Sequence, residues 1–207
     1  MKKIFCTLMI LALMIFPSIG GATQIKSTDY NGDFQFVYPT ISTSNAIIDS
    51  MINEKIREEV KNFFDAVKQP DNSITATMSY EIPCDKNNIL SIILTEYTYS
   101  EGAAHPLTFK RALNFDTRTG KLIGIDNIKK ISREYAKADY TPKGITRKLK
   151  AYAEREGIYL YNDFKELEKL PDDFYFDEKF HLHFVFQQYE VAPYAAGIID
   201  VDVEEEK

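Results

Sequence analysis

Three histidines are the residues of this chain whose types and spacing are suited to metal chemistry. His181 and His183 lie two positions apart in a segment that alternates polar and apolar residues, so both side chains point to one face of a strand. With His105 they would offer three ring nitrogens to a zinc ion and leave its fourth position to water. That arrangement suits a metal-dependent hydrolase. In the opposing interpretation Leu182 and its apolar neighbours face the core, and the histidines face solvent or form hydrogen bonds and bind no metal.

A second group of candidates could bind a ligand without reacting with it. His105 lies in a loop of small residues, and Tyr189, Glu190 and Tyr194 lie together near the C-terminus. A tyrosine ring with its hydroxyl suits contact with a glycan or a protein partner. The structural alternative is that His105 ties its own loop and that the tyrosines hold a turn against a sheet. Glu190 has no carboxylate partner nearby in the sequence, so a glycosidase pair is not indicated.

The other catalytic templates are missing from the sequence. There is no Gly-x-Ser-x-Gly and no His-Glu-x-x-His, and Gly120-Lys121 lacks the spacing of a phosphate-binding loop. Cys84 has no base motif beside it, so we expect a buried apolar side chain. With 25 basic against 31 acidic residues, the chain has no basic surface for nucleic acid. The sequence therefore predicts a protein that is not an enzyme and needs no cofactor.

Residues 1–22 are typical of a signal peptide. Two lysines precede an apolar run from Ile4 to Phe16, and small residues up to Ala22 suit cleavage after that residue. The run has 13 residues, which span only about 20 Å of a hydrocarbon core about 30 Å thick. Cleavage would remove two lysines and take the formal charge from −6 to −8. We therefore expect a secreted or periplasmic protein with no membrane span, in which Cys84 is the remaining cysteine.

The hydrophobic periodicity predicts an α+β fold, with an antiparallel sheet and helices packed on one side of it. Apolar residues spaced three and four apart indicate one long helix, and strict alternation indicates several strands. The expected elements are a strand at 34–38, a helix over 44–69, strands over 74–82, 89–99 and 107–115, a turn over 116–121, a helix beginning at Thr141-Pro142, a short helix capped by Asp163 and Glu166, a hairpin of 174–176 with 182–186, and a last strand over 198–203.

Three segments together resemble one known secreted module. They are the Gly-Ala-Ala-His-Pro loop at 102–106, the turn at 114–121, and the Tyr-Glu-x-Ala-Pro-Tyr-Ala-x-Gly stretch at 189–197. This pattern resembles the extracytoplasmic domain of unknown function of the anti-sigma factor RsiV, which also accompanies the peptidoglycan deacetylase PdaC. The residues before 85, where Tyr38-Pro39 leads into the long helix, are similar to the small domain that usually precedes that module.

After the signal peptide predicted at 1–22, the resemblance implies a small N-terminal domain at 23–85 and a C-terminal α+β domain at 86–207. In RsiV the region binds lysozyme outside the membrane, and in PdaC it accompanies a separate catalytic domain. Since neither a sigma-binding segment nor a deacetylase domain is recognised here, we expect neither activity. The resemblance implies a non-catalytic cell-envelope binding module whose ligand is lysozyme or peptidoglycan. The alternatives are the three-histidine hydrolase and a structural envelope protein without a ligand.

Overall fold

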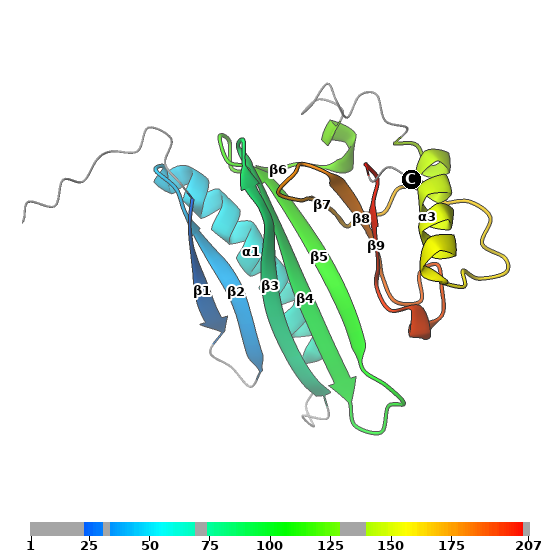
Figure 1. The fold of residues 1–207 in the computed structure, drawn as a ribbon. Coiled ribbons are helices and arrows are strands. Elements are labelled where there is room, and N and C mark those ends of the chain that lie inside the picture. The colour runs from blue at the N-terminus through cyan, green and yellow to red at the C-terminus, as the bar shows by residue number, and fades with distance from the viewer. Residues whose placement is uncertain (1–22, 31–33, 69–73, 129–139, 205–207) are drawn as a thin grey trace, which may run out of the picture.

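The computed structural model describes residues 23–30, 34–68, 74–128 and 140–204 (Figure 1). The expected signal peptide, residues 1–22, lies outside this part of the chain. Within it, no helix is both long enough and apolar enough to cross a membrane.

The first half of the described chain builds a six-stranded sheet in the order β1-β2-β3-β4-β5-β6. Its neighbours are antiparallel except for β2 and β3, which are parallel because α1 carries the chain back between them. The bounds are β1 Gln24–Tyr30, β2 Gln35–Ser42, α1 Ala46–Val67, β3 Ile74–Lys86, β4 Ile89–Ser100, β5 Leu107–Asp116 and β6 Lys121–Leu122.

Helix α1 covers one face of this sheet (Figure 1). The Asn45 side chain caps its first turn by accepting hydrogen bonds from the backbone N–H groups of Ile47 and Ile48. Every third or fourth residue after that is apolar, so one stripe of the helix packs on the sheet. The core between them includes Phe36, Ile52, Ile56, Val60, Phe63, Leu90, Ile92, Leu94 and Phe115.

The second half forms a three-stranded antiparallel sheet of β7 Phe174–Phe176, β8 Leu182–Phe186 and β9 Ile199–Asp202. Helix α3, Pro142–Glu156, packs on one face of it and shares a core with Phe184 and Val201. Thr141 caps the start of α3, and Gly157 ends it with a φ of 67°. The described connections include the 3-10 helices η1 Ile125–Asn127 and η3 Tyr194–Ala196.

The two sheets meet through β4 and β5 on one side and β7 on the other. Ile93, Tyr175 and Val185 form a small apolar cluster between them. Beside it, the Ser91 hydroxyl donates to Asn114 Oδ1 at 2.7 Å, and Asn114 Nδ2 donates to the Phe174 carbonyl at 2.6 Å. The small sheet is thus attached by apolar packing and by a buried polar network.

The expected α+β class is confirmed, but the strands form two sheets instead of one, and each sheet has its own helix. Strand β1 was not expected. The expected boundary between residues 85 and 86 falls near the end of β3, and strands on both sides of it pair in one sheet.

The short helix expected from the Asp163 and Glu166 capping pair does not form. The segment is instead fixed against α3, because the Leu167 N–H donates to Thr146 Oγ1 at 3.0 Å and Lys150 Nζ donates to the Lys165 carbonyl at 2.7 Å. Tertiary hydrogen bonds here outweigh a local capping signal.

Candidate functional site

His105 lies at the centre of an aromatic cluster. Its ring stacks on Tyr194 with the centroids 3.7 Å apart, and its Nε2 is 2.8 Å from the Tyr189 hydroxyl. Nδ1 is 3.1 Å from the Pro106 carbonyl. Since a carbonyl can only accept, Nδ1 donates there, and the Nε2 of the neutral ring accepts from Tyr189. We call His105, Tyr189 and Tyr194 the aromatic cluster.

Tyr189 is the exposed member of the aromatic cluster. Its φ of 66° places it in the left-handed region, which bulky residues rarely adopt, and 47% of the residue remains exposed. Glu190 stabilises this turn, because its Oε2 accepts from the Gln187 N–H at 2.7 Å. Backbone conformations of this kind cluster at functional sites.

The loop that carries Tyr189 is anchored to strand β5 by side chains. Gln188 Oε1 accepts from the Thr108 N–H at 2.8 Å, and Gln187 Oε1 accepts from the Lys110 N–H at 3.0 Å. Gln187 Nε2 also donates to the Lys110 carbonyl at 2.7 Å. These groups bond the edge of β5 as a neighbouring strand would. They therefore fix the loop beside the hairpin whose tip carries His105.

The structure brings three of the four predicted ligand-binding residues together. His105, Tyr189 and Tyr194 are in contact although His105 and Tyr189 are 84 positions apart. Glu190 bonds the backbone of its own turn and thus positions Tyr189.

His181 and His183 face away from the core of their sheet, as the alternation predicts, while Leu182 and Phe184 are fully buried. His183 Nδ1 is 2.9 Å from Asp200 Oδ1, and His181 Nδ1 is 2.8 Å from Asp202 Oδ2. Burial lowers the pKa of His183, but the hydrogen bond and charge of Asp200, together with the charges of Asp202 and Asp177, outweigh it and leave the pKa above its usual value. These histidines are partners of carboxylates.

The hypothesis of a three-histidine zinc site is wrong. His105 lies in the aromatic cluster, whereas His181 and His183 each bond a carboxylate of β9. In the described part of the chain, no group of three or more His, Cys, Asp or Glu residues is arranged to hold a metal ion.

Sequence reasoning missed the partners of His183. Tyr175 stacks on its ring at 4.6 Å and donates a hydrogen bond to Asp200 Oδ2 at 2.6 Å. The signal was the alternation of aspartates in β9, which places Asp200 and Asp202 on the same face as the two histidines.

Cys84 is buried, as expected, and burial raises the pKa of its thiol to about 11. At neutral pH it is a protonated apolar side chain and not a nucleophile.

Two family models match the chain, one in each half. Residues 25–108 match the family model described as Deacetylase PdaC, and residues 122–206 match the model described as Protein of unknown function, DUF3298. The predicted resemblance is thus confirmed in both halves of the chain. No protein with a curated description matches the sequence.

One solved structure shares this fold. A crystal structure of a DUF3298 family member from Bacteroides fragilis superposes with a TM-score of 0.62 at 13% identity, over 88% of this chain and 90% of that one. A DUF3298 family protein from Pseudomonas aeruginosa gives a TM-score of 0.47 at 11% identity, over 87% of this chain and 89% of that one. At such identity the Bacteroides structure establishes a shared fold.

Proposed function

We propose that this chain is an exported, non-catalytic binding module of the cell envelope and that its ligand is lysozyme. The two family models support an accessory module of this kind. The resemblance to the RsiV region implies lysozyme or peptidoglycan as the ligand.

The observation that carries the proposal is the exposed ring of Tyr189. A hydrogen bond to His105 holds its hydroxyl, and His105 is in turn stacked on Tyr194. A tyrosine that is already ordered loses little conformational entropy when a partner covers it. Tyrosine is also one of the residues that contribute most to protein interfaces.

The charge of the chain favours lysozyme over peptidoglycan. The chain carries a formal charge of −6, or −8 without residues 1–22. Lysozymes are typically basic, so opposite net charges would speed association and make it sensitive to salt. A glycan strand offers no comparable positive field.

The test is a calorimetric titration of the protein, expressed with its natural N-terminus, with hen lysozyme at about 20 mM and about 300 mM salt. The expected result is saturable binding at low salt that weakens at high salt. A parallel sedimentation assay with insoluble peptidoglycan tests the other ligand. Absence of lysozyme binding at low salt would overturn the proposal, and so would binding to peptidoglycan alone.

A further inference from the structure

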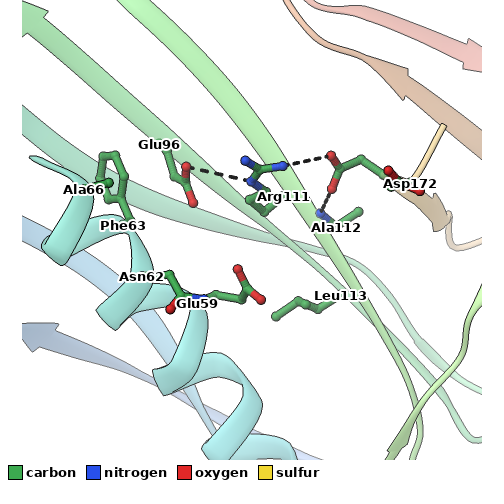
Figure 2. A pocket seen from close by; sticks show the side chains of 10 residues that line it. Glu59, Asn62, Phe63, Ala66, Glu96, Arg111, Ala112, Leu113 and Asp172 are labelled. Atoms are coloured by element: carbon green, nitrogen blue, oxygen red, sulfur yellow. Dashed lines mark hydrogen bonds and ion pairs between the residues drawn. The ribbon is translucent and has the colours of Figure 1, made fainter.

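A cavity of about 390 Å³ lies between the C-terminal half of α1 and strands β4 and β5 (Figure 2). This volume is within the range of small-molecule sites. Phe63 and Leu113 supply apolar surface, and both are largely buried. Glu59, Glu96 and Arg111 supply the charge. The cavity is separate from the aromatic cluster, with which it shares no residue.

Glu96 is the unusual residue of this cavity. Its side chain is only 9% exposed, and the structure pairs it with Arg111. Arg111 Nε lies 4.0 Å away, the outer limit of an ion pair, while Arg111 Nη1 lies 3.5 Å from Asp173. Asp173, in contrast, accepts from the Ala112 N–H and from Gln187.

The charges around Glu96 leave an excess of negative charge. Glu59 points from α1 toward the same space (Figure 2), and Arg111 is shared between Glu96 and Asp173. Burial of a carboxylate disfavours its charge, and the binding of a cation compensates for the lost hydration. The carboxylates therefore favour a cationic ligand, and the apolar walls favour a short hydrocarbon chain attached to it.

We propose that this cavity binds a primary alkylammonium group, with the ammonium between Glu96 and Glu59 and the methylene groups against Phe63 and Leu113. An ammonium supplies three hydrogen-bond donors, and carboxylate oxygens accept them. A free amine and a lysine side chain carry the same chemistry. Probes of both kinds distinguish these two sources.

The affinity depends on pH through Glu96. Burial raises the pKa of Glu96 to about 7; Arg111 lowers it, and Glu59 and Asp173 raise it further. Asp172, at the rim of the cavity, is paired with Lys169. An ammonium needs the ionised carboxylate, so binding tightens as the pH rises through about 7.

The experiment is a calorimetric titration of the full-length chain with n-butylammonium at pH 8, alongside n-butanol and acetate. A second arm uses Nα-acetyl-lysine methylamide, and tighter binding of that probe identifies a lysine side chain as the source. The proposal expects saturable binding of at least one ammonium probe and none of butanol or acetate. Equal binding of butanol, binding of acetate, or no binding of either ammonium probe would overturn it.

Variants locate the site. Glu96→Gln should weaken ammonium binding at least about tenfold, because it removes a charge-assisted hydrogen bond, and should remove the pH dependence. Glu54→Gln, at an exposed position of α1, is the matched control. It should change neither the affinity for ammonium nor the pH dependence of that affinity. Ala66→Phe, at an exposed position that lines the cavity, should block binding while Glu96 stays in place. Unchanged binding in both Glu96→Gln and Ala66→Phe would overturn the proposal.

Discussion

Glu96 occupies a strand position that would ordinarily be apolar. Leu90, Ile92 and Leu94 precede it at every second position of β4 and face α1, so the alternation points the Glu96 side chain to the same layer. The carboxylate is therefore buried, and its pKa rises from an ordinary value of 4.5 to about 7. A charged residue that continues an apolar alternation was the sequence signal for this site.

This shift predicts that Glu96 reduces stability at alkaline pH. A carboxyl with a raised pKa in the folded state favours folding below pH 4.5, and that contribution is lost as the pH rises through about 7. Glu96→Gln should therefore gain stability relative to the original protein between pH 5 and pH 8, by about 1–3 kcal/mol. Urea unfolding of both proteins at pH 5 and at pH 8 measures this difference in unfolding free energy. A gain that is equal at both pH values, or one also found in Glu54→Gln, would contradict the explanation.

Among the elements, the turn between β5 and β6 is fixed by contact with α1. Gly120 has a φ of 70°, as expected for this turn, and a Cβ there would lie 3.1 Å from Met51 Cβ and 3.3 Å from the Ile48 carbonyl oxygen. The turn thus depends on glycine for two reasons, backbone conformation and space.

Gly102 provides a matched comparison, because its φ is 81° but a Cβ there would have no neighbour within 4 Å. Gly120→Ala should cost about 2–4 kcal/mol of unfolding free energy, and Gly102→Ala about 1 kcal/mol, since the second change adds backbone strain alone. Thermal and urea unfolding of both variants give the comparison. Equal losses of unfolding free energy in the two variants would show that the contact with α1 does not contribute to stability.

The sequence predicted those elements whose own residues determine them. The apolar spacing of α1, the alternation of β3 and β5 and the continuous apolar centre of β4 are local signals. The observed elements closely follow the expected ranges. Strand β1 is mostly exposed and lacks a clear apolar alternation. It forms by pairing with β2, and its own sequence does not indicate that pairing. The helix expected near Asp163 does not form, because contacts with α3 override a local capping signal that is present in the sequence.

The candidate site was predictable as a set of residues but not as a geometry. His105 and Tyr189 were chosen from their motifs, yet the bond between them depends on Gln187 and Gln188 docking on β5. Contacts between segments about 80 positions apart leave no periodic trace in a sequence. Glu190, in contrast, acts locally, because its carboxylate accepts from the Gln187 N–H within the same turn.

At the scale of the molecule, two apolar cores are joined by a small interface around Asn114. Asn114 is buried and bonds both Ser91 of β4 and the Phe174 carbonyl of β7. Its removal would leave buried polar groups without partners in the layer that couples the sheets.

Asn114→Ala should therefore lower the unfolding free energy by about 2–3 kcal/mol, whereas Asn62→Ala, at an exposed position of α1, should change it by less than about 0.5 kcal/mol. The original protein should unfold in one transition, with the same midpoint by far-ultraviolet circular dichroism and by tyrosine fluorescence. Separate midpoints in the original protein would mean that the two cores unfold independently.

The most direct test of the binding function compares two exposed tyrosines. Tyr189 is 47% exposed within the aromatic cluster, and Tyr159 is 87% exposed outside it. Tyr189→Gly removes the ring and tolerates the positive φ, while Tyr159→Ala is the control. Lysozyme titration at low salt should show binding by the original protein, a loss of at least about tenfold in Tyr189→Gly, and less than about a twofold change in Tyr159→Ala. No binding by the original protein, or equal binding by Tyr189→Gly, would contradict the account.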